Sequence, residues 1–442
     1  MKRINLTLAV LLLLVKIGIA QVGFDKSKLD TYFDTLDKNN QFMGSVAVSR
    51  NGEVIYSKTI GFADFENKVK ATENHKYKIG SISKTFTAVL TLKAVEENKL
   101  KLEQTIDKWF PSIKNAGKIT LRHLLTHRSG IHNFTDDQDY LTWNTQVKSQ
   151  EQMVELIVKA GSDFEPDNKA NYSNSNYVLL TFILEKAFKK SYPELLKKHI
   201  TTTLGLKNTY VFGKIDPNKN ECKSYKFAGT WTLEPETDSS IPLGAGAIIS
   251  TPKDLNVFAD ALFNGKLLKP ESLDMMKRIK DGYGAGLFQM PFANKVSYGH
   301  SGGIDGFSSS FCHFADGNLS YALISNGTKM NSNNISIAVL SAVYGRPYEI
   351  PVFTNYSTKP EDLDQYLGVY VSKQIPLKIT FTKNGNLLIG QGNGQQPLAL
   401  EATGKDKFKV DQVGAKFEFY PLEGKMILRQ NGAEFMFNRE EK

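Results

Sequence analysis

A chain of 442 residues, 41% hydrophobic and 23% charged, has the composition of a globular protein with two or three folded units. Its formal net charge of +9 at pH 7 is spread along the chain, and no block of lysines or arginines is interleaved with aromatic residues. Composition and charge therefore do not indicate a nucleic-acid-binding protein.

The first twenty residues have the layout of a secretory signal peptide. Lys2 and Arg3 precede an apolar stretch from Leu6 to Val15, and the small residues Gly18 and Ala20 follow it. This stretch is too short to span a bilayer comfortably, and no later segment approaches twenty uncharged apolar residues. We therefore expect a soluble exported protein, periplasmic or secreted, without a stable membrane anchor. An uncleaved N-terminal anchor is the alternative.

The mature chain opens with two runs of strand-like composition, Gly44–Val48 and Val54–Thr59. Asn51 and Gly52, a pair that readily forms a tight hairpin turn, separate them. From Ile82 to Glu97, apolar residues recur at helical spacing without glycine or proline. The pattern predicts a hairpin followed by a largely buried helix.

The middle of the chain, residues 105–264, mixes helical stretches with long polar loops. Helical periodicity is clearest at 152–158 and 178–188, and the longest polar loop is expected at 216–240. This mixture predicts a helical lobe that carries loops.

Strand patterns return after the lobe. Strands are expected at 307–313 and 319–325, joined across Asp316-Gly317, and a helix at 334–344. Prolines then interrupt a polar stretch, and we place a domain boundary near residue 355. The segment from Leu367 onward predicts a small antiparallel barrel or sandwich, with turns at Asn384-Gly385, Gly392–Gly394 and Glu423-Gly424.

Two cysteines and a group of histidines are explained without a disulfide or a metal site. Cys222 lies in a polar loop and Cys312 in an apolar run, which favours two unpaired thiols over a disulfide. The spacing of His123, His127 and His132 matches no metal-binding motif, so we expect no metal and no cofactor. Asn133 or His132 is a further candidate for lining the cleft, and Trp143 and Trp231, in polar loops, are candidates for bordering a pocket.

A candidate nucleophile lies at the start of the predicted helix. In a helix, Ser81 and Lys84 share one face, so the lysine amine can reach the serine hydroxyl. This four-residue pattern is weak alone, because Ser250–Lys253 fits it equally. That second copy is better explained as a helix start, with Thr251 as cap and Pro252 in the first turn.

Two further motifs follow in order along the chain. Asn171–Asn174 contains a phenol, Tyr172, two residues before the Asn174 amide. Gly299–Gly303 is a glycine-flanked segment with a possible cation, His300. Together, Ser81-x-x-Lys84, Tyr172-x-Asn174 and His300-Ser301-Gly302 resemble the three motifs of the class C β-lactamase and penicillin-binding serine hydrolase family. Supporting stretches that also resemble this family are Leu124–Gly130, Gly244–Gly246 and His300–Phe307.

The resemblance implies a fold and a mechanism. The fold is α/β (α+β), with an antiparallel sheet and a helical lobe over residues 21–350. A lipocalin-like barrel follows over 358–442, whose opening, Leu363–Tyr370, resembles the domain appended to many such hydrolases. This barrel is expected to cover the cleft, limit substrate size, mediate assembly or serve structure alone.

In the implied mechanism, Ser81 attacks a carbonyl carbon while Lys84 or Tyr172 takes its proton. The backbone N–H groups of Ser81 and Gly303 would hold the oxyanion. Asn174 would bind the substrate amide and position Lys84, and His300, Ser301 and Gly302 would line the substrate site.

The third motif departs from the lysine-containing version, Lys-Thr-Gly, of class A enzymes. His300 replaces a permanent cation with a group that is only partly charged near pH 7, which weakens the case for β-lactamase activity. Histidine here is similar to D-alanyl-D-alanine peptidases and D-amino-acid peptidases of the family. The expected activity is therefore one of these peptidases on a peptide or small-molecule substrate. The alternatives are a carboxylesterase, then a β-lactamase, or a catalytically silent sensor.

Overall fold

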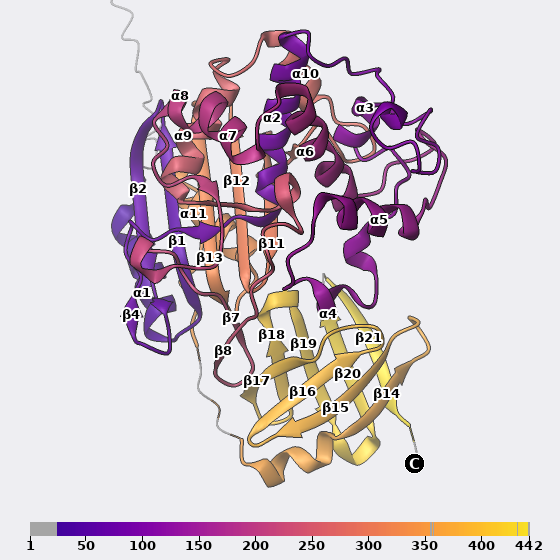
Figure 1. The fold of residues 1–442 in the computed structure, drawn as a ribbon. Helices are drawn as coiled ribbons and strands as arrows, with labels where there is room; N and C mark the ends of the chain where they lie inside the picture. Colours follow the sequence, from indigo (N-terminus) through magenta and orange to yellow (C-terminus); the bar gives the residue numbers. More distant parts are fainter. Residues whose placement is uncertain (1–23, 354–355, 357, 431, 441–442) are drawn as a thin grey trace, which may run out of the picture.

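The computed structural model describes residues 24–353, 356, 358–430 and 432–440. The expected signal segment lies outside these described residues. Among the described residues, no helix is both long and apolar enough to cross a membrane. Figure 1 shows a sheet flanked by helices, with a separate barrel formed by the C-terminal strands.

A six-stranded antiparallel sheet lies at the centre of the N-terminal part, in the order β10-β11-β12-β13-β1-β2. The predicted first hairpin is confirmed, with Asn51 and Gly52 both at positive φ in its turn. The strands predicted at 307–313 and 319–325 are confirmed as β12 and β13. The strands of this sheet are β1 (Phe42–Arg50), β2 (Glu53–Ile60), β10 (Phe288–Gln289), β11 (Tyr298–Ile304), β12 (Phe307–Phe314) and β13 (Leu319–Thr328).

Helices cover both faces of this sheet because its strands alternate apolar side chains between the two sides. In β13, Tyr321 and Leu323 pack in a cluster with α1 (Lys26–Lys38) and α11 (Ser332–Val343). The intervening Ala322 joins the larger cluster on the opposite face. That larger cluster contains the apolar side chains of α2 (Ser83–Glu96), α6 (Asn174–Phe188) and α9 (Pro252–Phe263).

The predicted helical lobe is present beside the sheet. Its remaining helices are α3 (Leu121–Leu125), α4 (Tyr140–Trp143), α5 (Gln150–Ala160), α7 (Tyr192–Leu196), α8 (Thr202–Leu204) and α10 (Pro270–Lys277). The short strands outside the central sheet are β3 (Phe62–Asp64), β4 (Val69–Lys70), β5 (Tyr77–Lys78), β6 (Tyr210–Val211) and β9 (Ile248–Ser250). The loop expected at 216–240 also contains a hairpin, β7 (Tyr225–Phe227) and β8 (Trp231–Leu233), which corrects the sequence prediction.

The C-terminal segment forms a closed eight-stranded barrel, so the prediction of a small antiparallel β unit is confirmed in its barrel form. Its core is built from inward-facing residues such as Phe381, Phe419 and Phe437. The three predicted turns fall between consecutive strands. The strands are β14 (Gly368–Ser372), β15 (Lys378–Asn384), β16 (Leu387–Gly392), β17 (Leu398–Gly404), β18 (Lys407–Val410), β19 (Ala415–Tyr420), β20 (Lys425–Gln430) and β21 (Ala433–Arg439).

The two cysteines are free and buried, as the unpaired interpretation expected. Cys312 packs in the cluster with α1 and α11, whereas Cys222 packs in the larger cluster on the opposite face of the sheet. Cys222 is fully buried, although the polar sequence around it suggested an exposed loop.

Candidate active site

Ser81 lies in a single 3-10 turn, Gly80–Ile82, that leads directly into α2. Strand β11 passes so close to this turn that a Cβ atom added to Gly80 would lie 2.8 Å from the Gly303 backbone nitrogen. Gly80 also has φ +50°, a conformation that glycine adopts without strain. Close backbone approach therefore brings the first and third motifs together, at the amino end of a buried helix.

The Lys84 amine is fully buried and makes three short contacts. Its Nζ lies 3.0 Å from Ser81 Oγ, 2.7 Å from Asn174 Oδ1 and 2.7 Å from the Ala245 carbonyl oxygen. Burial lowers the pKa of Lys84 well below its ordinary value. Because a neutral amine has two N–H donors and one lone pair, it can donate to both carbonyl oxygens while its lone pair faces the Ser81 hydroxyl.

Tyr172 lies next to this amine and is only partly exposed. The Lys84 Nζ is 4.8 Å from the centroid of the Tyr172 ring. The centroid of the His127 ring lies 4.5 Å from the centroid of the Tyr172 ring. Burial raises the pKa of Tyr172, and the nearby Ser81 hydroxyl opposes this increase only in part. The phenol is therefore protonated near neutral pH and is suited to donating a proton.

Asn174 is the first residue of α6, and its amide is fully engaged. The Oδ1 atom accepts from Lys84, and Nδ2 donates to Asn133 Oδ1 at 3.2 Å and to Thr135 Oγ1 at 3.0 Å. The Asn174 backbone N–H also donates to Asn133 Oδ1 at 2.9 Å. Because both Nδ2 protons already have acceptors, this geometry supports the predicted positioning of Lys84 more directly than the predicted contact with a substrate amide.

His300 lies beside these groups but is buried, with 2% of its surface exposed. Its Nδ1 donates to the Ser301 carbonyl oxygen, and its ring packs 4.3 Å from that of Phe288, centroid to centroid. Burial lowers the pKa of His300 to about 3. His300 is therefore neutral at pH 7, which corrects the expectation that it is a partial cation there.

An open cleft of about 560 Å³ lies over Ser81. Asn174, Ala245 and Gly303 line it around the nucleophile, and Tyr140 and Leu141 line it from the helical lobe. Tyr172 and His300 are not among the lining residues. The cleft offers the Ser81 hydroxyl to a carbonyl group, with the Lys84 amine beside the serine and the Tyr172 ring beside the amine. A serine, an amine and a phenol are the set needed for acyl transfer.

The residues that sequence reasoning offered as further cleft-lining candidates have other roles. His132 contacts Asp163 and Asp137 at 2.8 Å and 3.2 Å and does not line the cleft. Trp143 and Trp231 are buried and do not line the cleft. Among the described residues, no group of three or more His, Cys, Asp or Glu side chains is placed to hold a metal ion. The alternative serine–lysine pair is a helix start, as predicted, with the Thr251 side chain accepting from Asp254 N.

One buried ion pair near the site escaped the sequence prediction. Lys78 Nζ lies 2.9 Å from Asp305 Oδ2, with 0% and 2% of the respective side chains exposed. Asp305 Oδ1 also accepts from the Thr237 N–H at 3.0 Å and from its hydroxyl at 2.6 Å. This pair ties the strand before Ser81 to the turn after β11.

The model of the Beta-lactamase family matches residues 29–345. The chain belongs to the Beta-lactamase family. Its mixed fold with an antiparallel sheet confirms the predicted class, and its similarity to characterised hydrolases shows that it is a serine hydrolase.

Three relatives extend the comparison beyond the family model. Penicillin-binding protein 4* of Bacillus subtilis is 26% identical, over 92% of this chain and 97% of the relative. Teichoic acid D-alanine hydrolase of Staphylococcus aureus is 30% identical over 62% of this chain and 68% of the relative. The solved structure of D-amino acid amidase from Ochrobactrum anthropi SV3, complexed with L-phenylalanine amide, has a TM-score of 0.62 at 26% identity, and covers 72% of this chain and 99% of the amidase chain.

Proposed function

We propose that this protein is an exported D-amino-acid peptidase that forms an acyl-enzyme on Ser81 and releases a D-amino acid from an amide or ester. The observation that carries the proposal is the absence of an unpaired cation among the described residues that line the cleft. Lys226, the one lysine in that lining, is paired with Glu234 at 2.6 Å. His300 is buried and neutral, and Lys84 faces Ser81.

This charge pattern separates two kinds of substrate. A β-lactam or a peptide ending in D-alanyl-D-alanine carries a carboxylate next to the bond that is cut, and a cation would stabilise it. An amide or ester of a D-amino acid needs no such partner. Relatives named as a D-alanine hydrolase and a D-amino acid amidase support the second kind.

D-alanyl-D-alanine carboxypeptidase activity is the second candidate. The relative named penicillin-binding protein 4* aligns along 92% of this chain, including the barrel, and this coverage favours it. A carboxylesterase, a β-lactamase and a silent sensor are less well supported, because no observation at the site selects them.

The proposed reaction begins with proton transfer from Ser81 to the Lys84 amine. The 3.0 Å contact and the lowered pKa of Lys84 support this role over a phenolate on Tyr172, whose pKa is raised. Ser81 Oγ bonds to the substrate carbonyl carbon, and the backbone N–H groups of Ser81 and Gly303 stabilise the oxyanion. The leaving amine or alcohol takes a proton from the Tyr172 phenol, which Lys84 reprotonates. Water then repeats the sequence and releases the D-amino acid.

The test compares three substrates under identical conditions: D-alanyl p-nitroanilide, its L-enantiomer, and an N-acetylated peptide ending in D-alanyl-D-alanine. We expect turnover of the D-anilide, little of the L-anilide and less of the peptide. Ser81→Ala is the matched control and should abolish all turnover. Preferred cleavage of the carboxylate-bearing peptide would transfer the assignment to the carboxypeptidase candidate, and equal rates for both enantiomers would refute D-specificity.

We extend the proposal to the organisation of the chain. Residues 1–20 would direct export and be removed, residues 21–350 would form the hydrolase domain, and residues 358–442 the barrel domain. The family match at 29–345 and the first barrel strand at Gly368 support this division. N-terminal sequencing of the secreted protein tests the export signal.

A further inference from the structure

The β7–β8 hairpin lies between the cleft over Ser81 and the C-terminal barrel. Lys226 and Glu234, at the two sides of the hairpin, line the cleft. The neighbouring Phe227 lines a second cavity, of about 280 Å³, between the N-terminal part and the barrel. Successive residues of a strand point to opposite faces, so one short strand contributes to both spaces.

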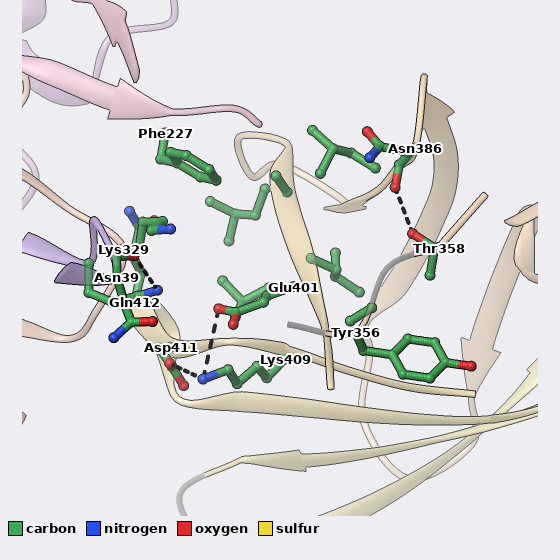
Figure 2. Close-up of a pocket in the computed structure, with 17 residues that line it drawn as sticks. Asn39, Phe227, Lys329, Tyr356, Thr358, Asn386, Glu401, Lys409, Asp411 and Gln412 are labelled. Atoms are coloured by element: carbon green, nitrogen blue, oxygen red, sulfur yellow. Dashed lines mark hydrogen bonds and ion pairs between the residues drawn. The ribbon is translucent and has the colours of Figure 1, made fainter. Parts of the chain in front are cut away.

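The second cavity is built from both parts of the chain. Figure 2 shows Phe227 and Lys329 from the N-terminal part together with Glu401, Lys409 and Asp411 from the barrel. Lys329 Nζ lies 4.4 Å from the centroid of the Phe227 ring. Cation–π contact of this kind helps to hold the aromatic ring at the cavity.

The tip of the hairpin rests directly on the barrel. A Cβ atom added to Gly229 would lie only 2.1 Å from Leu387 Cδ1, so the leucine side chain packs against the hairpin backbone. A nearby hydrogen bond, from Gln412 Nε2 to the Thr328 carbonyl oxygen at 2.6 Å, also joins the barrel to the N-terminal part. The barrel therefore contacts both the tip of the hairpin and Thr328, the last residue of β13.

The base of the hairpin contacts the turn that follows β11. The Gly306 N–H donates to Ser224 Oγ at 3.1 Å, and a Cβ atom on Gly306 would lie 2.7 Å from the Tyr225 backbone nitrogen. Because β11 contains Gly303, contacts run without a gap from the barrel through the hairpin to the strand beside Ser81. None of the described residues that line the cleft belongs to the barrel.

We infer that the barrel controls substrate specificity indirectly, by positioning the hairpin whose Lys226–Glu234 pair forms one wall of the cleft. This inference rests on one part of the proposed function, the assignment of Ser81 as the nucleophile. A D-aminoacyl peptide that extends along the cleft contacts this wall, whereas a small acylating reagent reaches Ser81 without it. Loss of the barrel contact therefore affects recognition of long substrates and leaves the reactivity of Ser81 intact.

The test uses Leu387→Ala, with Leu377→Ala as the matched control. Both leucines are partly buried in the barrel, and Leu377 packs against the barrel core without lining the cavity. For Leu387→Ala we expect a change in KM for a D-alanyl hexapeptide of about twofold to thirtyfold, and unchanged labelling of Ser81 by a small fluorophosphonate. Hydrogen exchange of the hairpin amides should quicken in Leu387→Ala but not in Leu377→Ala. Equal exchange in the two variants would overturn the inference.

A double-mutant cycle isolates the contact itself. Gly229→Ala places a methyl group against Leu387 and is also strained at φ +87°, and the strain is the same whether or not Leu387 is present. We expect Leu387→Ala to reverse part of the defect of Gly229→Ala, and strictly additive effects would count against the contact. Failure of the fluorophosphonate to label wild-type Ser81 would instead reject the proposed function. Hydrogen exchange of the hairpin amides does not depend on catalysis, so the inference about the barrel can still be tested in that case.

Discussion

Replacing Asn174 with aspartate tests the role of the Lys84 amine. Asn174 Oδ1 is 2.7 Å from Lys84 Nζ, and Asn174→Asp places a negative charge at that distance with little change in shape. An opposite charge this close stabilises the ammonium form and raises the pKa of Lys84 by about one to three pH units. The neutral fraction, and with it kcat/KM, should fall by about tenfold to a thousandfold below both pKa values.

The sign of the pH dependence is the decisive readout. In the wild type, kcat/KM rises as pH increases through the lowered pKa of Lys84. In Asn174→Asp, this acidic limb should move to higher pH, and the two rates should converge at high pH. A variant that is only misfolded loses activity at all pH values and shows no such shift.

The assay measures kcat/KM for D-alanyl p-nitroanilide across the pH range, with thermal unfolding as a check of folding. Asn144→Asp is the matched control, because Asn144 lines the same cleft. Its side-chain amide donates to Thr237 Oγ1 at 3.0 Å, whereas Asn174 accepts from Lys84. An acidic limb that stays in place in Asn174→Asp would refute the assignment of Lys84 as the base.

Three further predictions concern the surroundings of the nucleophile. Tyr172→Phe should lower kcat by about 10²- to 10⁴-fold, because it removes the phenolic proton, and steady-state kinetics with a D-alanyl anilide will show this. Asp305→Asn should destabilise the protein by about 1–3 kcal/mol, because the buried Lys78 ammonium loses its partner at 2.9 Å and keeps only Glu236, at 3.7 Å. In denaturant unfolding, adding Lys78→Met should recover part of this loss, and no recovery would argue against the ion pair. Burial lowers the pKa of His300 from 6.5 to about 3, so the unfolded chain binds more protons than the folded chain between these pH values. The contribution of His300 to the free energy of unfolding is therefore full above pH 6.5 and decreases as pH falls toward 3. His300→Gln should flatten this dependence by about 1 kcal/mol per pH unit, and an unchanged slope in acid unfolding would contradict it.

Local patterns made much of the fold predictable from sequence. Asn51-Gly52 indicated the first hairpin, helical spacing after Ser81 indicated α2, and the repeated turn residues indicated the C-terminal strands. The β7–β8 hairpin was missed although a signal was present, since Tyr225–Phe227 and Trp231–Leu233 each alternate apolar and polar residues. Strands of three residues are too short for this alternation to stand out within a polar segment.

The site was predictable only where its chemistry is local or follows a motif. Ser81 and Lys84 are three residues apart in a helical segment, so their contact follows from helix geometry. The Lys78–Asp305 pair joins residues 227 positions apart and has no local signature. The protonation state of His300 depends on its burial beside Phe288, which only the three-dimensional structure shows.

The most direct test of the central claim is to trap the acyl-enzyme. Wild-type protein and Ser81→Ala are each mixed with a D-alanyl thioester, quenched in acid within milliseconds to seconds, and analysed by intact mass and peptide mapping. We expect a transient D-alanyl adduct on the peptide that contains Ser81, and none on the variant. An adduct that persists in Ser81→Ala, or turnover of the thioester by the wild type with no adduct at any time, would contradict it.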